Sequence, residues 1–431
     1  MVTITINNSY SRIAGLTAIQ EKQLKAELSY VVGGSSSYYS GFGPRKKSLL
    51  DKKGNFPTGL KYKVSSWLHA TKTKFLHKDA RTRPKRMPDY VLPVVPYISQ
   101  TKAVDIALIK ERGIISMPTG SGKSLVIALI VSRLNVKTLV VVPSLEIKKQ
   151  LVEALKSAGV PDKVTVENID SNALDKCTDF DCLIIDEAHH VAAKTYQKLN
   201  AKVWTGIFYR FFLTATPFRN DLEEMMLFEA IAGKVIYQLS YKDAVKEGYI
   251  VPVEAYYVEV PKQETEAHTW QQVYSQLVVN NNKRNEIIAL TLLRFNASNV
   301  STLCLVKEVA HGKALAELTG LPFISGEDDE SRQYIRQFSA KQITAVIATT
   351  GIMGEGVDTK ACECVIVAGL GKAKSQFMQQ VGRGVRRFEG KESCKVILVR
   401  DISHKFTLRH YNAQRRILKD EYGTIPLKLE I

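Results

Sequence analysis

Short, uninterrupted apolar runs alternate with longer stretches of helical periodicity along most of the chain beyond residue 90. A continuous run of four or five apolar residues is typical of a strand that is buried on both faces of a parallel sheet. The runs form two series, at 113–117, 138–142, 182–185 and 211–213, and then at 302–306, 345–348, 365–367 and 396–399. Strands that alternate with helices indicate βαβ units. The pattern therefore predicts an α/β protein with two parallel-sheet lobes, joined near residues 240–255.

The first 90 residues follow a different pattern. They begin with a strict alternation of Val2, Ile4 and Ile6, which predicts a half-buried strand, and continue with a helical stretch near 16–31. Residues 71–88 are basic and contain two prolines, so they are interpreted as a linker. The sequence thus predicts a small basic α+β domain, and the expected domains are 1–90, 91–248 and 249–431.

Composition narrows the class of protein. The chain has 431 residues, of which 45% are hydrophobic and 24% charged, and these values exclude wholesale disorder, collagen and a coiled-coil fibre. The longest uncharged apolar run, 125–131, is too short for a membrane span. Six irregularly spaced cysteines lack the spacing of a zinc site. We expect reduced structural cysteines, no zinc, no membrane contact and a cytoplasmic location, which is the host cytoplasm if the protein comes from a phage.

The net charge of +17 favours a polyanionic partner. Fourteen basic and only three acidic residues lie between residues 41 and 90, so most of the excess charge belongs to the N-terminal domain. A solvated surface would also account for such a stretch. As a hypothesis, Lys46, Lys47, Arg83 and Arg86 contact nucleic-acid phosphates, and the aromatic residues of this domain either stack on bases or form its core. These aromatic residues are Tyr38, Tyr39, Phe42 and Trp67.

A glycine-rich loop after the predicted strand 113–117 has the composition of a phosphate-binding site. It precedes an apolar helix and contains Pro118, Thr119, Gly120, Ser121, Gly122, Lys123 and Ser124. The two glycines let the backbone wrap a phosphate, the helix N-terminus adds its amides, and Lys123 supplies a cation. Ser124 is expected to hold Mg²⁺ through its hydroxyl. The position that is usually the first glycine of such loops is Met117.

The second chemical motif is a pair of carboxylates at the end of the predicted strand 182–185. Ligand sites of α/β proteins lie at the carboxyl ends of their strands. Asp186 is expected to hold the Mg²⁺ shell, and Glu187 to orient and deprotonate the water that attacks the nucleotide.

With these motifs the sequence resembles the superfamily 2 helicases and translocases of the DEAH type, over about 340 residues from Val91 to the C-terminus. The resemblance implies two tandem RecA-like lobes, ATP and Mg²⁺ as cofactors, and roles for further residues. The nucleotide-contacting residues implied are Gln100, His189, Gly356, Asp358, Gln379, Arg383 and Arg386. The nucleic-acid and coupling residues implied are Pro143, Ser144, Thr214, Thr216, Thr349 and Thr350. Arg383 and Arg386 are spaced i, i+3, so we expect them on one helical face that reaches the γ-phosphate.

A narrower resemblance links the chain to the double-strand-DNA branch of the superfamily. It is carried by the segment 214–219, which reads TATPFR, by 241–252, and by Lys283-Arg284-Asn285. With the small basic N-terminal domain, these residues resemble the UvsW-like branch-migration helicases of tailed phages. This implies an ATP-dependent helicase acting on forked or junction DNA in recombination, replication or repair. Since the chain itself supplies Arg383 and Arg386, no ring is required and a monomer is compatible with the sequence, while the oligomeric state stays open. Two alternatives stay open: an RNA-remodelling DEAH ATPase, and a double-strand DNA translocase subunit that does not separate strands.

Overall fold

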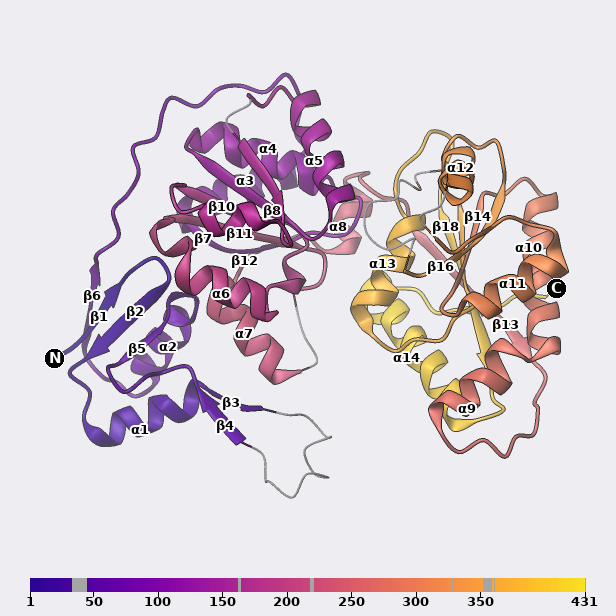
Figure 1. The fold of residues 1–431 in the computed structure, drawn as a ribbon, viewed down its shortest axis with the longest axis horizontal. Coiled ribbons are helices and arrows are strands. Elements are labelled where there is room, and N and C mark those ends of the chain that lie inside the picture. Colours follow the sequence, from indigo (N-terminus) through magenta and orange to yellow (C-terminus); the bar gives the residue numbers. More distant parts are fainter. Residues whose placement is uncertain are drawn as a thin grey trace. The chain divides into compact units, whose positions relative to one another are not determined.

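The computed structural model of the protein describes residues 1–32, 45–161, 164–217, 221–326, 329–351, 359 and 361–430. The chain divides into two compact units, which can be followed by colour in Figure 1. One unit comprises Met1–Met117 with Lys123–Leu239, and the other comprises Pro118–Gly122 with Ser240–Ile431.

A small α+β domain forms the N-terminal part of the first unit. Its sheet has the strand order β5-β2-β1-β6, in which β1 is antiparallel to β2 and parallel to β6. The elements are β1 (Val2–Ile6), β2 (Tyr10–Ala14), α1 (Ala18–Glu27), β3 (Ser29–Val32), β4 (Arg45–Ser48), β5 (Asn55–Pro57), a 3₁₀ helix (Thr58–Leu60), α2 (Lys61–Ala70) and β6 (Phe75–Asp79). Val2, Ile4 and Ile6 are buried, as their alternation predicts, and they pack with Phe56 and Leu68 in one core.

Two predictions for this domain are wrong. The helix expected over 16–31 ends at Glu27, because Ser29–Val32 pair as β3 with β4. The linker expected over 71–88 contains β6, which pairs along its whole length with β1. Only Phe75 of β6 is partly buried, so this strand is held by backbone pairing that a hydrophobic pattern does not reveal.

The N-terminal domain and the first parallel-sheet lobe share a hydrophobic core. Ala230 belongs to the same buried cluster as Leu60 and Phe56. The Lys63 Nζ lies 2.9 Å from Glu229 Oε2. The guanidinium of Arg210, which is fully buried, donates to Ser9 Oγ at 2.9 Å. The domain is therefore packed firmly on the lobe.

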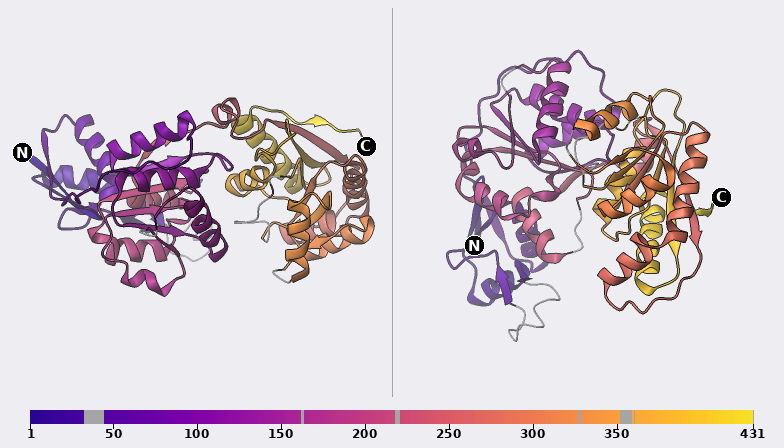
Figure 2. Two further views of the ribbon diagram at one scale, coloured as in Figure 1. Left: turned by 90° about the horizontal axis from the view of Figure 1, so that it is seen from above. Right: turned by 45° about the vertical axis from the view of Figure 1, so that its right-hand side comes forward.

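The first lobe contains a six-stranded parallel sheet with the order β12-β7-β11-β10-β8-β9. Its strands are β7 (Arg112–Ser116), β8 (Thr138–Val142), β9 (Val164–Asn168), β10 (Cys182–Ile185), β11 (Tyr209–Thr214) and β12 (Val235–Gln238). The helices α3 (Ile98–Lys110), α4 (Lys123–Leu134) and α5 (Leu145–Ser157) cover one face, while α6 (Lys194–Lys202) and α7 (Leu222–Ala232) cover the other (Figure 2). Because both faces are covered, β8, β10 and β11 are buried at every position.

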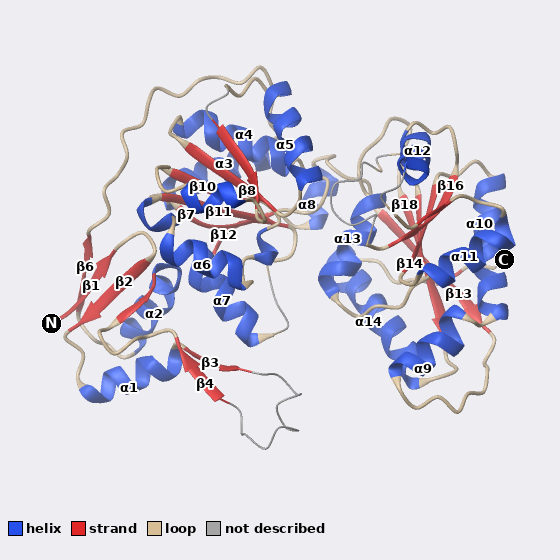
Figure 3. Ribbon diagram, viewed as in Figure 1, coloured by secondary structure: helices blue, strands red, loops and turns tan. Residues whose placement is uncertain are grey.

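The second unit is built around a seven-stranded, all-parallel sheet with the order β15-β16-β14-β17-β18-β13-β19. Strands β13, β14, β16 and β18 of this sheet are labelled in Figure 3. Its strands are β13 (Val253–Val260), β14 (Thr302–Val306), β15 (Phe323–Ile324), β16 (Ala345–Thr349), β17 (Cys364–Val367), β18 (Cys394–Asp401) and β19 (Leu427–Lys428). Its helices are α8 (Tyr241–Lys246), α9 (Trp270–Tyr274), α10 (Asn282–Ala297), α11 (Val309–Thr319), α12 (Asp329–Ser339), α13 (Lys374–Gly384) and α14 (Lys405–Tyr422). Two parallel-sheet lobes with a small α+β domain confirm the predicted fold class.

The cysteines lie inside the two units. All six are buried and form no disulfide. Within the described ranges, no group of three or more His, Cys, Asp or Glu residues is arranged to hold a metal ion. No helix in the part of the chain that the structure describes is both long and apolar enough to cross a membrane.

We predict that Gly59→Ala weakens the packing of the N-terminal domain on the first lobe. A Cβ at Gly59 would lie 2.2 Å from the carbonyl oxygen of Glu229 and 2.5 Å from that of Ala230, so the backbones must separate. Overpacking of this kind costs about 1–3 kcal/mol. The measurement is hydrogen exchange of residues 1–79, which should become faster.

The control is Gly206→Ala in the same unit. A Cβ there meets only the Thr178 carbonyl oxygen, at 4.0 Å. Unchanged exchange in Gly59→Ala would show that the two parts do not depend on this contact.

Candidate nucleotide and nucleic-acid site

The strand order of the first lobe brings three sequence motifs to one edge. β11 lies between β7 and β10 and is parallel to both. The phosphate loop follows β7, Thr214 ends β11, and Asp186 follows β10. Since parallel strands present their carboxyl ends at the same edge, these residues come together although they are distant in sequence.

The phosphate loop has the backbone conformation that its glycines predict. Gly120 and Gly122 have φ values of 86° and 76°, a left-handed region that side chains with a Cβ rarely adopt. Ser121 closes the turn, because its Oγ donates to the Pro118 carbonyl at 2.7 Å. Helix α4 begins at Lys123, so its first amides face the end of the loop. A helix N-terminus after such a turn favours an anion.

Lys123 and the two carboxylates form a compact charged cluster. The Lys123 Nζ lies 3.4 Å from Glu187 Oε1, and His189 Nδ1 lies 3.3 Å from Glu187 Oε2. Asp186 is 7% exposed, and its Oδ1 accepts the Glu187 backbone amide at 2.9 Å. Burial opposes ionisation of Glu187, but Lys123 and His189 outweigh this effect and keep its pKa below the ordinary value.

Glu187 also has a strained backbone. Its φ of 44° and ψ of 47° are left-handed, which is uncommon for a residue with a long side chain. Strain of this kind often occurs at functional sites, where the surrounding structure holds it in place. The Asp186 carboxylate and the Ser124 hydroxyl are hard oxygen donors, a ligand type that suits Mg²⁺.

Three other predicted residues of the first lobe have local structural partners. The Gln100 side chain accepts the Tyr97 amide at 3.0 Å and so caps helix α3. Ser144 caps α5 by accepting the Ile147 amide at 3.3 Å, directly after Pro143. Thr214 accepts the Thr216 amide at 3.1 Å. These bonds fix the start of α3 and the loops after β8 and β11.

In the second unit, the predicted helical pairing of the arginines is wrong. Arg383 lies on α13 and is 6% exposed, but the helix ends at Gly384. Arg386 instead forms an antiparallel bridge with Ile250. Gln379 also lies on α13, one turn before Arg383.

The remaining residues of the second unit are placed as follows. Thr349 ends β16 and the amide of Thr350 donates to the Val306 carbonyl at 2.8 Å, so both lie at the carboxyl edge of the sheet. Arg284 and Asn285 are buried: Arg284 donates to the Ala368 carbonyl at 2.9 Å, and Asn285 lies 3.1 Å from His311 Nε2. Gly356, Asp358, Arg219, Tyr38, Tyr39 and Phe42 lie outside the described residues.

Sequence reasoning missed Lys391, which holds the arginine segment in place. Its buried Nζ contacts the carbonyl oxygens of Cys362 and Gly384 and donates to that of Arg386 at 3.0 Å. Thr359 Oγ1 also donates to the Arg383 carbonyl, at 3.0 Å. Burial lowers the pKa of Lys391. No local pattern indicates this role, because the contacts join separate segments of the chain.

The basic residues predicted to contact nucleic acid fall into two groups. Lys46 and Lys47 are exposed on β4. Arg83 and Arg86 are also exposed, but Arg83 forms an ion pair with Glu111 and Arg86 donates to the Arg133 carbonyl, so both are tied to the first lobe. Trp67 packs against the core of the N-terminal domain.

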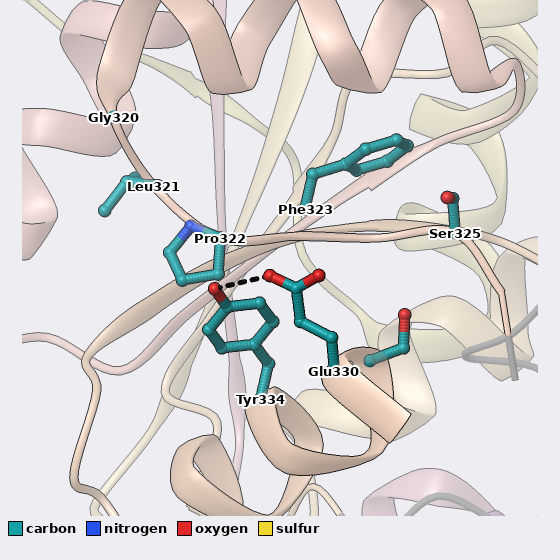
Figure 4. A pocket seen from close by; sticks show the side chains of 8 residues that line it. Gly320, Leu321, Pro322, Phe323, Ser325, Glu330 and Tyr334 are labelled. Atoms are coloured by element: carbon teal, nitrogen blue, oxygen red, sulfur yellow. Dashed lines mark hydrogen bonds between the residues drawn. The ribbon is translucent and has the colours of Figure 1, made fainter. Parts of the chain in front are cut away.

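The second unit also has a hollow of about 360 Å³ beside the edge strand β15 (Figure 4). Glu330 and Tyr334 of α12 line it together with Pro322 and Phe323, and Tyr334 donates to Glu330 at 3.0 Å. None of the predicted site residues lines this hollow.

Two family models match the chain in order. Residues 97–176 and 162–219 match the res subunit of type III restriction enzymes, and residues 274–388 match the helicase conserved C-terminal domain. The fold defines a protein with two parallel-sheet lobes and a glycine-rich loop between β7 and α4. With both motor domains matched, the chain belongs to the superfamily 2 helicases and translocases, a class of ATP-dependent nucleic-acid motors.

Curated relatives are distant. The DNA 3'-5' translocase XPB2 of Sulfurisphaera tokodaii is 24% identical over 359 residues, which cover 70% of this chain and 80% of that protein. Across five curated relatives, the matched part spans between 47% and 80% of the length of the relative.

A solved structure shares the fold. A fragment assigned to the HsdR subunit of a type I restriction enzyme of Vibrio vulnificus aligns with a TM-score of 0.60 and 19% identity, over 79% of this chain and 69% of that one. The crystal structure of T4 UvsW aligns over 99% of both chains, with a TM-score of 0.45 and 17% identity.

We predict that Lys391→Met lowers the turnover of ATP about 10- to 100-fold with little change in KM. The segment that carries Arg383 and Arg386 loses its internal tether, and a displacement of about 1 Å can cost 10²-fold in rate. Steady-state ATPase assays measure kcat and KM separately, and Lys391→Arg should restore part of kcat.

Lys341→Met is the control, because Lys341 pairs with Glu363 at 3.8 Å and is 37% exposed. Equal loss of rate in both lysine variants would contradict a positioning role for Lys391.

Proposed function

We propose that the protein is an ATP-driven DNA motor that unwinds or branch-migrates forked and junction DNA. The observation that carries the proposal is the cluster of Lys123, Asp186 and Glu187 at the edge of the first parallel sheet. In this proposal the domains are 1–90, 91–248 and 249–431.

Each residue of the cluster has a chemical role in ATP hydrolysis. The backbone of Pro118–Gly122 and the first amides of α4 bind the phosphates of ATP, and Lys123 exchanges its carboxylate partner for phosphate oxygens. Glu187 is ionised in this site, since Lys123 and His189 keep its pKa below the ordinary value, and in this proposal its carboxylate accepts a proton from the attacking water.

Mg²⁺ fits the donor set of this site. Ser124 and Asp186 would hold the ion, which supplies positive charge against the β- and γ-phosphate oxygens when it is bound. Asp186 is prepared for this role because the Glu187 amide orients its carboxylate.

The second lobe supplies the remaining nucleotide contacts. Arg383 and Arg386 stabilise the charge on the transferred phosphoryl group, and Gln379, Gly356 and Asp358 complete the site. Gln100 and His189 act from the first lobe, where Gln100 contacts the adenine. Because the arginines and Lys123 lie on different lobes, hydrolysis requires closure, and closure followed by reopening moves the strand.

DNA is the proposed substrate, in forked or branched form, and the process is recombination, replication or repair. The support is the net charge of +17, the exposed Lys46 and Lys47, and the motifs shared with the double-strand-DNA branch of the superfamily. Pro143, Ser144, Thr214, Thr216, Thr349 and Thr350 lie at strand ends, where they are proposed to contact the backbone or couple it to hydrolysis. Arg83 and Arg86 contribute positive potential at the edge of the N-terminal domain. We propose a monomer that acts in the cytoplasm.

We predict that Glu187→Gln lowers kcat for ATP at least ~100-fold while ATP stays bound, because the amide cannot take the proton. Lys123→Ala should weaken ATP binding itself. A fluorescent ATP analogue and phosphate release measure the two steps. Glu167→Gln is the matched control, since Glu167 also pairs with a lysine, Lys148, at 2.9 Å. Rapid turnover by Glu187→Gln would contradict the role of Glu187.

We predict that a fork and a four-way junction stimulate ATP hydrolysis more than linear duplex, single strand or RNA. We also predict that labelled junctions are separated into their component strands. Lys46→Ala/Lys47→Ala should reduce affinity for these junctions without changing turnover at saturating DNA. Stimulation by plain duplex without strand separation would favour the translocase alternative. Stimulation by RNA alone would favour an RNA-remodelling ATPase.

A further inference from the structure

Four aromatic side chains of the second unit form a continuous cluster between α9 and the start of α14. The Trp270 ring is stacked on His410 with centroids 4.4 Å apart and an angle of 11°. Tyr274 and Phe406 approach Trp270 at 5.3 and 6.0 Å. Trp270 and His410 are partly exposed, so part of the stack faces solvent.

Positive charge surrounds this cluster. Lys307 Nζ lies 5.4 Å from the centroid of the Tyr274 ring. Arg409 directly precedes His410 in α14. Burial lowers the pKa of His410, and the charges of Lys372, Arg409 and Lys307 lower it further. All three are exposed. Burial raises the pKa of the Tyr274 hydroxyl, and the negative charge of Glu308 raises it further.

The cations stand at the edge of the sheet where the strands end. Lys307 directly follows β14, and Lys372 lies in the loop after β17, the neighbouring strand. Gln414 of α14 donates to the Gly371 carbonyl of this loop at 3.2 Å, which ties α14 to the edge. Thr350 lies at the same edge, since its amide donates to the Val306 carbonyl.

We propose that the Trp270–His410 stack, with Lys307, Lys372 and Arg409, is a binding site for an unpaired DNA strand. Exposed rings bind unpaired bases by stacking, whatever the base, and flanking cations bind the phosphates. The proposal deepens the proposed function, on which it rests: it adds a strand-holding site to the second lobe, beyond the threonines at its sheet edge. None of the three cations belongs to the predicted motifs.

The first test compares two triple variants with equal loss of charge. Lys307→Ala/Lys372→Ala/Arg409→Ala should weaken binding of single-stranded oligo-dT and make the salt dependence of log K shallower by about 2, because each phosphate contact contributes roughly 0.7 on a single strand. The control, Lys313→Ala/Arg332→Ala/Arg336→Ala, removes three exposed cations from α11 and α12. An equal change of slope in both variants would overturn the proposal.

The second test observes the stack directly. Oligo-dT should quench part of the tryptophan fluorescence of the wild type, and this part should be absent in Trp270→Phe, which keeps Trp67 and Trp204. His410→Ala should reduce affinity about tenfold, within the range that base stacking contributes. Thermal unfolding of each variant checks that the second unit stays folded. Quenching that persists unchanged in Trp270→Phe would overturn the proposal.

The outcomes also separate this site from the proposed function. If the first triple variant binds oligo-dT as the wild type does and its ATPase is still stimulated by DNA, the proposed strand site is wrong and the proposed motor function is retained. No binding of DNA by the wild type would overturn both. Preferential binding of an RNA oligonucleotide, with the same change of slope, would overturn the assignment to DNA.

Discussion

The placement of β11 between β7 and β10 is the constraint on which the chemistry of this protein depends. Parallel pairing puts the ends of all three strands at one edge, and only there does Lys123 come within 3.4 Å of Glu187. The strands can occupy this position because they are apolar on both faces and helices cover both sides of the sheet. Packing of the apolar strands therefore fixes the sheet, and the strand order of the sheet brings the charged residues of the site together.

Part of the positive charge of the N-terminal domain stabilises the packing of this domain on the first lobe, in addition to contributing to the net charge of the protein. Arg81 and Arg83 both pair with Glu111, and their guanidinium groups lie 4.4 and 5.4 Å from the ring of Phe208. With the core that the domain shares with Ala230, these contacts make it part of the body of the first lobe. A DNA strand bound at Lys46 and Lys47 would then move together with the N-terminal domain and the first lobe.

The sequence predicted what depends on local pattern. The runs 138–142, 182–185 and 302–306 coincide with β8, β10 and β14, because a strand buried on both faces must be continuously apolar. The loop after β7 could also be predicted from the sequence, since its positive φ values require glycines. The predictions that failed concern features that depend on contacts between separate segments of the chain. β6 is held by its neighbour's backbone, Arg386 leaves the helix after Gly384, and Lys391 acts through carbonyl groups of other segments.

The second lobe joins the proposed strand site to the arginines through one segment of chain. The loop after β17 carries Lys372, and α13 begins at Lys374 and ends at Gly384, just past Arg383. At a rise of 1.5 Å per residue, the 11 residues of this helix span about 16 Å. The loop end is fixed to α14 by Gln414, and the arginine end is fixed by Lys391 and Thr359. In the proposed function, the loop that carries Lys372 and the segment that carries Arg383 are thus joined by a single helix. A strand bound at this loop would act on Arg383 through α13, and this is the route that we propose between DNA position and the hydrolysis of ATP.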